Sequence, residues 1–234
     1  MSEDSRIVST EHNLDVLYED NHLIIINKRS GDICQGDQTG DTPVSDLVKL
    51  FLKEKYDKPG NVFAGVVHRL DRPTSGALIL AKTSKALSRM NEQFRKNEIK
   101  KTYWALADKR PQEMSGRLHH FLKKDEQNNK SKAHKKNVPG GKESILEYDV
   151  ISEQNRITLF ELNPHTGRHH QIRVQLSSIG CPILGDGKYG SSVKSKNGRL
   201  YLHARTIEFM HPTKKELMKI TAPLPQDVLW RKFN

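Results

Sequence analysis

The 234-residue chain has only two cysteines and no long hydrophobic run. Cys34 and Cys181 lie outside any CxxC pattern, which argues against a disulfide scaffold and favours a reducing compartment. The longest apolar stretch near the start, Leu23–Ile26, is too short to cross a bilayer, and the polar, acidic first residues lack the apolar core of a signal peptide. These absences predict a cytoplasmic protein with two ordinary thiols and no membrane contact.

Cofactor motifs are missing too. The sequence contains neither the phosphate-binding loop GxxxxGK[ST] nor the dinucleotide fingerprint GxGxxG. His165, His169 and His170 are close in sequence, but no cysteine or HExxH arrangement accompanies them, which makes a zinc site a poor interpretation. We therefore expect no cofactor and no metal.

Positive charge is what the chain has in excess. Lys and Arg total 39 against 28 Asp and Glu, giving a net charge of +11, which favours contact with polyanions. Residues 123–142 hold seven lysines and a Pro-Gly-Gly turn, with little apolar content. This segment predicts a basic loop or hairpin tip, which is either solvated surface or a projection that grips phosphate.

Apolar patterns predict more strands than helices. Helices are expected after Thr42-Pro43, at Ser84 and after Thr166, with each Thr or Ser as N-cap. The expected strands lie at residues 14–27, 77–81, 101–107, 145–151, 156–162, 199–209 and 216–220. Because the two types do not alternate strictly, the predicted class is α+β, with a central mixed, largely antiparallel sheet flanked by helices. A flexible segment, 1–13, is expected to precede one catalytic domain, 14–234.

The densest group of reactive side chains is HRLDRPTSG, residues 68–76. One carboxylate, Asp71, lies among two arginines and a histidine, and Pro73 and Gly76 imply a bent backbone. Nearby positive charge keeps a carboxylate ionised, as a nucleophile must be. Taken alone, this pattern is more often a structural Arg–Asp pair in a turn.

Three further groups stand out. NPHTGRHHQIR, residues 163–173, places two arginines and three histidines at a predicted helix start, where free N–H groups attract anions. In KTYWAL, residues 101–106, Tyr103 and Trp104 point to opposite faces of a strand, so one is free to stack on a base. LHA, residues 202–204, is a fourth candidate group, but an ordinary edge or core strand explains it equally well.

Together these motifs resemble the RluA-type pseudouridine synthases. HRLDRPTSG is similar to that family's HRLD-x-x-TSG, TGRHHQIRV to its TGR-x-HQ-[IL]-RV, and IGCPILGDGKYG to its IG-x-PI-x-GD-x-x-YG. KTYWAL and LHA occupy the expected places, and the resemblance spans roughly residues 14–223. It implies the pseudouridine synthase fold and a cofactor-free isomerisation of uridine in ribosomal or transfer RNA. Only a dozen residues precede this region, so we expect a stand-alone catalytic domain without the family's frequent S4 domain.

The resemblance also implies residue roles. Asp71 falls on the catalytic aspartate, Tyr103 on the tyrosine that packs against the target base, and Arg168 on the arginine that pairs with the catalytic carboxylate. Arg69 falls on the arginine that fills the gap left by the flipped uridine, and Leu202 lines the base pocket. Further RNA contacts are expected at four side chains: His68, Thr74, His170 and Arg173.

The chain departs from the family pattern at two positions, and other functions stay open. His169 stands where Thr or Ser is common and Gln175 where His is frequent, so both are expected to bear on RNA contact. One rival is a non-catalytic RNA-binding protein. Another is a glycoside hydrolase or N-glycosylase using Asp71, although no paired carboxylate accompanies it. The expected partner is structured RNA, and a monomer is the default.

Overall fold

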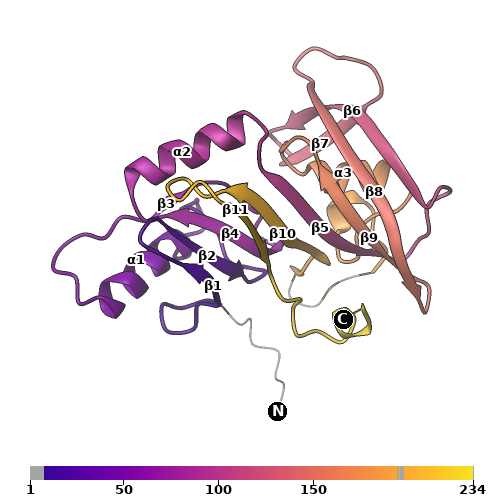
Figure 1. Cartoon of the computed structure of the whole chain (residues 1–234). Coiled ribbons are helices and arrows are strands. Elements are labelled where there is room, and N and C mark those ends of the chain that lie inside the picture. The colour runs from indigo at the N-terminus through magenta and orange to yellow at the C-terminus, as the bar shows by residue number, and fades with distance from the viewer. Residues whose placement is uncertain (1–7, 194, 196–197, 234) are drawn as a thin grey trace. The chain divides into compact units, whose positions relative to one another are not determined.

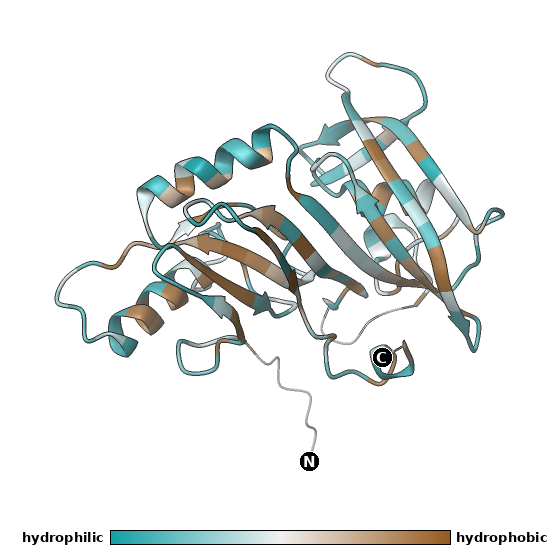
Figure 2. Cartoon of the chain, in the orientation of Figure 1, coloured by the Kyte–Doolittle hydropathy of each residue, from teal (hydrophilic) through white to brown (hydrophobic). Residues whose placement is uncertain are grey.

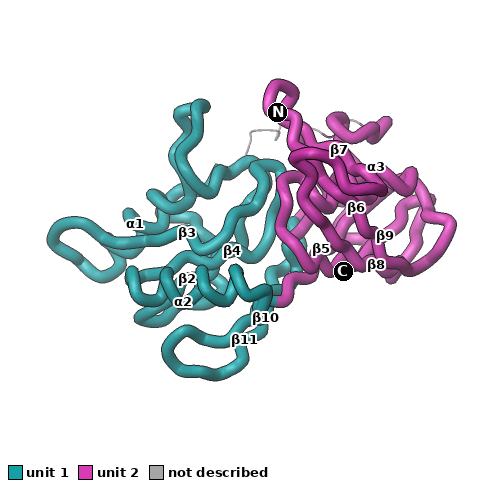
Figure 3. Tube along the Cα trace, turned by 90° about the horizontal axis from the view of Figure 1, so that it is seen from above, with its two compact units in different colours: residues 1–99, 204–225 teal, residues 100–203, 226–234 magenta. Residues whose placement is uncertain are grey.

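The computed structural model describes residues 8–193, 195 and 198–233, which form two compact units (Figure 1, Figure 3). Unit 1 contains the chain up to residue 99 together with residues 204–225, and unit 2 contains residues 100–203 and those from 226 onward. Residues 1–7 of the predicted flexible segment, 1–13, lie outside the described residues. Within that segment the Ser9 hydroxyl donates to the Asp32 carboxylate at 2.6 Å, so the segment is anchored to unit 1 at this point.

The strands of unit 1 follow the order β1-β2-β4-β10, with β3 paired to β4 and β11 to β10. The β1–β2, β2–β4, β3–β4 and β10–β11 pairs are antiparallel. Their bounds are β1 Val16–Glu19, β2 Leu23–Lys28, β3 Gly65–Val66, β4 Ser75–Ala81, β10 Leu202–Met210 and β11 Leu217–Thr221. Ile25 of β2 lies opposite Ile79 of β4, and β10 enters unit 1 at Ala204. The strands predicted in this part of the chain are therefore confirmed, although β10 begins later than expected.

Strands β2 and β4 are buried on both faces. Every residue of 23–26 and 77–81 is at most 1% exposed, and Figure 2 shows these stretches as hydrophobic. Side chains alternate along a strand, so Ile25 and Ile79 share a face and pack with Met90 of α2 (Ser84–Arg95). The alternate side chains point to the other face, on the side where Figure 3 shows α1 (Val44–Lys55). Burying each such aliphatic side chain stabilises the fold by about 1.5–3 kcal/mol.

Both helices of unit 1 begin beside the predicted cap. Pro43, and not Thr42, is the N-cap of α1, and no side chain caps that helix. At α2 the N-cap is Thr83 rather than Ser84, because the extended backbone of Thr83 lets its hydroxyl accept the Ala86 N–H at 3.2 Å. The predicted helices are thus confirmed, and their predicted caps are wrong by one residue.

Unit 2 is built on strands in the order β5-β9-β8-β6-β7, all antiparallel. Their bounds are β5 Lys100–Ala107, β6 Ser115–Asp125, β7 Lys130–His134, β8 Lys142–Gln154 and β9 Ile157–Pro164. The strands predicted at 101–107, 145–151 and 156–162 are confirmed. The basic segment 123–142 contains the end of β6 and all of β7, so of the two predicted forms, a loop or a hairpin tip, the hairpin is the one present.

One helix, α3 (Gln171–Ser178), supplies Ile172 and Leu176 to the apolar cluster of unit 2. Its N-cap is His170, whose backbone is left-handed with φ 54, so the predicted cap at Thr166 is wrong. Among its described residues, the unit also contains short 3-10 helices at Gly187–Tyr189 and Trp230–Phe233. The α+β class with a largely antiparallel sheet and flanking helices is confirmed. Within the described ranges, no helix has the length and apolar character needed to span a membrane.

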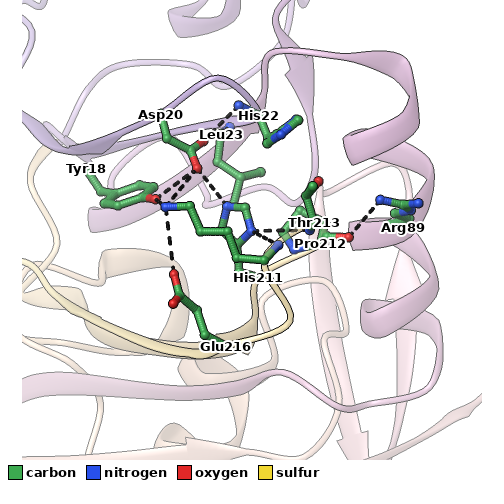
Figure 4. A network of polar contacts seen from close by, with 10 residues as sticks. Tyr18, Asp20, His22, Leu23, Arg89, His211, Pro212, Thr213 and Glu216 are labelled. Atoms are coloured by element: carbon green, nitrogen blue, oxygen red, sulfur yellow. Dashed lines mark hydrogen bonds and ion pairs between the residues drawn. The ribbon is translucent and has the colours of Figure 1, made fainter.

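Asp20 is the centre of a polar network in unit 1 (Figure 4). Its carboxylate accepts the backbone N–H groups of His22 and Leu23, both at 2.8 Å, and the Tyr18 hydroxyl at 3.0 Å. Burial on its own raises the pKa of Asp20, but these hydrogen bonds outweigh it and hold the pKa well below its usual range. The carboxylate is therefore ionised whenever the fold is intact at moderate pH.

The fully buried His211 connects this network to the β10–β11 turn. Its Nδ1 accepts the backbone N–H groups of Thr213 at 3.2 Å and Lys214 at 2.9 Å. The ring proton must then lie on Nε2, which is 2.9 Å from the Asp20 carboxylate and donates to it. Asp20 thus joins the β1–β2 turn to the β10–β11 turn (Figure 4).

Replacing Asp20 by Asn is expected to lower the free energy of unfolding by about 2–4 kcal/mol near neutral pH, because the new amide N–H groups face other donors. The folded-state pKa of Asp20 lies below its unfolded value, so the carboxylate stabilises the fold above about pH 4. This contribution is lost as the pH falls below that value. Urea unfolding of both proteins should therefore show a difference that shrinks between about pH 5 and pH 2.

The matched control is Glu216→Gln in the same turn. The Glu216 side chain is 58% exposed and 3.7 Å from Lys214, so its loss should change stability by less than about 0.5 kcal/mol. An Asp20→Asn loss of equal size at acidic and neutral pH would contradict the assigned role.

Candidate active site

Asp71 lies in a tight turn between β3 and β4 of unit 1. The backbone N–H of Thr74 donates to the Asp71 carbonyl at 2.9 Å and closes the turn. Pro73 occupies a central position and restricts the backbone there. The bent backbone predicted around Asp71 is therefore present, and Asp71 itself is half-buried.

Residues 28–34, called the anchor loop from here on, hold this turn in place. The backbone N–H of Gly31 donates to the Arg72 carbonyl at 2.8 Å. The Ser30 hydroxyl donates to the Pro73 carbonyl, also at 2.8 Å. The two residues that follow Asp71 are thus tied to the anchor loop through their backbone carbonyls.

Cys34 fixes the residue before Asp71. Its thiol donates to the Leu70 carbonyl at 3.3 Å and accepts the Leu70 N–H at 3.4 Å. Burial raises the pKa of Cys34, which keeps the sulfur protonated and able to donate. With Leu70, Arg72 and Pro73 all engaged, the backbone on both sides of Asp71 is immobilised.

The two arginines of the motif behave differently. Arg72 pairs with the Asp41 carboxylate and donates to the Thr39 hydroxyl at 3.3 Å. The sequence did not suggest Asp41 as the partner of this arginine. Arg69 is exposed. Its predicted place in the gap left by a flipped nucleotide stays a prediction.

His68 and Thr74 have structural contacts in unit 1. The His68 Nε2 accepts the Ile79 N–H at 3.1 Å, and its ring stacks on Phe94 with centroids 5.0 Å apart. Thr74 is 2% exposed and its N–H closes the Asp71 turn. These contacts favour a supporting role for both residues, and their RNA contact stays a prediction.

Arg168 lies in unit 2, in the loop before α3, and Gln171 organises this loop. The Gln171 side-chain carbonyl accepts the Arg168 N–H at 3.0 Å, and its amide donates to the Ile145 carbonyl at 3.0 Å. Gln171 is 4% exposed, so these bonds are shielded from water. The exposed Arg168 side chain donates through Nε to the Glu143 carbonyl at 3.1 Å. The loop is thus fixed while the guanidinium reaches the surface of unit 2.

Tyr103 and Leu202 belong to one region of unit 2. Tyr103 lies on β5 opposite Leu162 of β9 and packs, half-buried, against the unit's apolar cluster. Leu202, which is 4% exposed, is a member of the same cluster. The structure therefore brings these two predicted base-contacting residues together on the same apolar cluster.

His170 and Arg173, both expected to contact RNA, are buried in unit 2. Burial, followed by the nearby charge of Arg173, lowers the pKa of His170 to about 2, so the ring is neutral. His170 Nδ1 lies 2.9 Å from the Tyr189 hydroxyl. Arg173 donates twice to the Asp186 carboxylate, at 2.7 and 2.8 Å. These contacts favour structural roles, and RNA contact by either residue stays a prediction.

Gln175 is fully buried, which corrects the expectation that it bears on RNA contact. Its amide donates to the Leu118 carbonyl at 3.1 Å inside unit 2. His169 is half-buried and stacks on His170, with ring centroids 3.8 Å apart. Among the residues that the structure describes, no group of three or more His, Cys, Asp or Glu side chains is arranged to hold a metal ion.

Comparison with known proteins decides the family. The sequence profile described as "RNA pseudouridylate synthase" matches residues 22–178, which is more than half of the chain. The chain belongs to the RNA pseudouridylate synthase family. It is therefore an isomerase that acts on RNA, and its expected RluA-type membership is confirmed.

Two curated relatives illustrate the similarity. The uncharacterised RNA pseudouridine synthase YhcT of Bacillus subtilis (strain 168) is 35% identical over 230 residues, covering 97% of this chain and 74% of that protein. Ribosomal large subunit pseudouridine synthase C of Buchnera aphidicola subsp. Baizongia pistaciae (strain Bp) is 39% identical over 218 residues, covering 89% and 66%. The chain thus spans about two thirds to three quarters of these relatives' length.

Solved structures agree with the fold. The human RNA pseudouridylate synthase domain containing 4 superposes with a TM-score of 0.76 at 26% identity, covering 91% of this chain and 89% of that one. The human RNA pseudouridylate synthase domain containing 1 superposes with a TM-score of 0.74 at 23% identity, covering 94% and 87%, and supports the fold alone.

In this pseudouridine synthase, the sequence interpretation missed the residues that hold the two site loops. Ser30 and Cys34 fix the Asp71 turn, and Gln171 fixes the Arg168 loop. Gln171 belongs to the TGRHHQ motif. A polar side chain in that motif could have been predicted to hold the loop in place. Ser30 and Cys34 carry no such signal, because their contacts are with backbone about 40 residues away.

Proposed function

We propose that this chain converts uridine to pseudouridine in ribosomal RNA, with Asp71 as the reacting carboxylate. The observation that supports Asp71 is its turn, in which the residues on both sides are held by hydrogen bonds to the anchor loop. Such a fixed backbone suits a group that must meet a sugar or base atom in one geometry. Several relatives are named ribosomal large subunit pseudouridine synthases, which supports ribosomal RNA as the target.

The reaction rearranges one nucleotide. The N1–C1′ bond breaks, the uracil turns, and a new bond joins C5 to C1′, while C5 loses its proton to solvent and N1 takes one up. The base must first leave the stack, as in other enzymes that act on bases inside folded nucleic acid. Asp71 then attacks C1′, attacks C6 or abstracts H2′, and these three routes stay open.

The other proposed roles follow the motif resemblance. Tyr103 and Leu202 hold the detached uracil, and their shared apolar cluster suits a site that excludes water. The net charge of +11 and the lysines of the β6–β7 hairpin favour structured RNA as partner. Cytoplasmic location and a monomeric state belong to the same proposal.

Tritium release tests the activity directly. RNA carrying 5-tritiated uridine should lose tritium to water in the presence of the protein, because only formation of the C5–C1′ bond frees that hydrogen. Binding without release would favour the non-catalytic RNA-binding alternative, and free uracil among the products would favour a glycosylase. Mapping pseudouridine in ribosomal and transfer RNA, with and without the protein, would identify the target.

Replacing Arg168 by Lys is expected to lower turnover by about 10²-fold or more, because a single point charge replaces a planar fork that binds a carboxylate through two N–H groups. Single-turnover tritium release measures the effect. The control is Arg117→Lys, an exposed arginine on β6 of the same unit, which should change turnover by less than about threefold. Normal turnover by Arg168→Lys would remove Arg168 from the mechanism.

A further inference from the structure

His169 follows Arg168 directly and is one of two positions at which the chain departs from the family pattern. Thr or Ser is common at this position, so the family motif does not explain the imidazole. The residue is half-buried, which leaves part of it accessible to solvent at the surface of unit 2. Its contacts inside unit 2 show that the ring is held in a defined orientation.

A column of side chains supports the His169 ring. His169 stacks on His170 with ring centroids 3.8 Å apart and an angle of 24° between the ring planes. The His170 ring meets the Tyr189 ring edge-on at 5.6 Å, and the Arg173 guanidinium lies over the Tyr189 ring at 5.1 Å. His170 is 8% exposed and Arg173 6%, so the inner part of the column is buried. His169 is therefore its outer member.

Ser131 of β7 fixes the rotation of the His169 ring. Ser131 is 4% exposed, and its hydroxyl donates to the His169 carbonyl at 2.8 Å. A hydroxyl has a single proton, so the His169 Nδ1, which lies 3.1 Å from the same oxygen, carries a proton and donates to it. The Ser131 N–H donates to the Tyr189 hydroxyl at 2.8 Å. One buried serine thus orders the ring before any ligand binds, which lowers the entropic cost of binding.

Two exposed lysines, Lys124 and Lys188, lie near the column. Burial is the main cause of the low pKa of His170, about 2, and the charges of Lys188 and Lys124 contribute to it. Lys188 donates to the Asn129 carbonyl at 3.3 Å, and Lys124 pairs with Glu126 at 2.6 Å. Exposed contacts of this kind are weak, so both ammonium groups can turn to the phosphates of an RNA strand.

Base flipping produces a ligand that suits such a ring. When the uridine leaves the stack, each neighbouring base loses the partner that covered one of its faces. Proteins that bind unpaired RNA cover such faces with aromatic side chains, histidine among them. Arg168 is proposed to act at the flipped nucleotide, and the Cα of His169 is about 3.8 Å further along the chain. The ring is therefore within reach of the next nucleotide of the strand.

We propose that His169 is a stacking site for the base next to the target uridine. The base packs on the ring, which His170 and Ser131 hold in place, and the two lysines bind phosphates of the same strand. This inference rests on the proposed function and adds a substrate contact that Thr or Ser cannot make. Because stacking strength grows with the size of the base, a purine is favoured over uracil at this position.

Short RNAs test this contact separately from the reaction. Fluorescence anisotropy at one salt concentration measures the binding of three labelled hexanucleotides, made of riboadenosine, of ribouridine and of abasic ribose phosphate. The wild type should bind hexaadenosine at least about fivefold more tightly than the abasic strand, with hexauridine between them. The three strands carry the same phosphates, so these differences report the bases alone.

His169→Thr removes the ring and introduces a residue that is common in the family, so the fold should be retained. Its affinity for hexaadenosine should fall at least about fivefold, and its affinity for the abasic strand should stay within about twofold of the wild type. A change in charge alone would weaken both strands alike. If His169→Thr does not fold, His169→Ser, the other common residue, takes its place.

His169→Phe separates stacking from hydrogen bonding. Phenylalanine keeps an aromatic ring but has no Nδ1–H to donate to the Ser131 hydroxyl. This variant should bind hexaadenosine within about threefold of the wild type. If it loses as much affinity as His169→Thr, the polar atoms of the imidazole hold the strand, and the stacking role is wrong.

The matched control is His165→Thr. His165 precedes Arg168 in the same loop, but it pairs with Glu147 at 3.0 Å and its side chain is 49% exposed. It does not belong to the column that supports His169. His165→Thr should therefore bind all three hexanucleotides as the wild type does, which separates the stacking role from the general effect of removing a histidine near Arg168.

Tritium release from ribosomal RNA connects the contact to the reaction. His169→Thr should raise the KM for this RNA at least about fivefold, because the base beside the target loses its stacking partner. Equal binding of hexaadenosine by the wild type and His169→Thr, or equal losses for the adenosine and abasic strands, would overturn the inference even if the protein releases tritium. Failure of the wild type to release tritium would instead overturn the proposed function, and the hexanucleotides would still decide whether His169 stacks on a base.

Discussion

Asp71→Asn is expected to lower turnover by about 10⁴-fold or more, because the amide can neither attack the sugar–base unit as a nucleophile nor take a proton from it. The substitution keeps the size and shape of the side chain. The turn is held by backbone groups, including the Thr74 N–H to the Asp71 carbonyl at 2.9 Å, and these do not depend on the carboxylate. Folding and RNA affinity should therefore stay close to those of the wild type.

Single-turnover tritium release, thermal unfolding and RNA binding measure the three quantities separately. Asp41→Asn is the control, since Asp41 is a nearby carboxylate that pairs with Arg72 and whose side chain is 50% exposed. It should keep turnover within about threefold of the wild type. If Asp71→Asn keeps more than about a tenth of the wild-type rate, Asp71 is not the reacting carboxylate.

Gly76→Ala is expected to lower the free energy of unfolding by about 3 kcal/mol or more. The Gly76 backbone has φ +117, a region that L side chains rarely adopt, and an added Cβ would lie 2.3 Å from the Ala204 carbonyl oxygen. Both atoms belong to unit 1, where β4 and β10 are neighbours. The backbone cannot yield easily at this point, because Ala204 lies within a strand.

For a protein of this size, such a loss corresponds to a fall in Tm of roughly 6–12 °C, which thermal unfolding followed by circular dichroism would measure. The matched control is Gly36→Ala, where an added Cβ meets no heavy atom within 4 Å. That variant should change the Tm by no more than about 2 °C. Equal Tm values for the two variants would contradict the close approach of β4 and β10.

The sequence predicted the buried strands well, since Leu23–Ile26 and Ala77–Ala81 are apolar at every position and are buried at every position. It predicted helix caps less well. Thr42 and Ser84 both have side chains that suit an N-cap. The N-cap is, however, the residue with extended backbone directly before the helix, and the tertiary path of the chain decides which residue that is.

The candidate site shows the same division. The turn around Asp71 followed from Pro73 and Gly76, and the motifs pointed to the family. The burial of Arg173 could not be predicted from the sequence. An arginine in a basic motif is buried only when the fold places a carboxylate such as Asp186 beside it. The burial of Lys28 was also not predicted, because its ammonium donates to backbone carbonyls, those of Asp32 and Arg72, which composition does not reveal. A hairpin tip was one of the two forms predicted for residues 123–142, but the strands β6 and β7 were not predicted, because their lysines mask the alternation of a strand.

The path of the chain through the two units has a consequence for synthesis on the ribosome. The apolar cluster of unit 2 uses residues between Ala105 and Leu202, so all of its members emerge in one continuous stretch. The cluster of unit 1 joins Leu23 and Ile25 to Ile207 and Phe209, so it stays incomplete until almost the whole polypeptide has been made. The half of the protein that is translated first is therefore the last to close its interior, and its exposed isoleucines must remain soluble in the meantime.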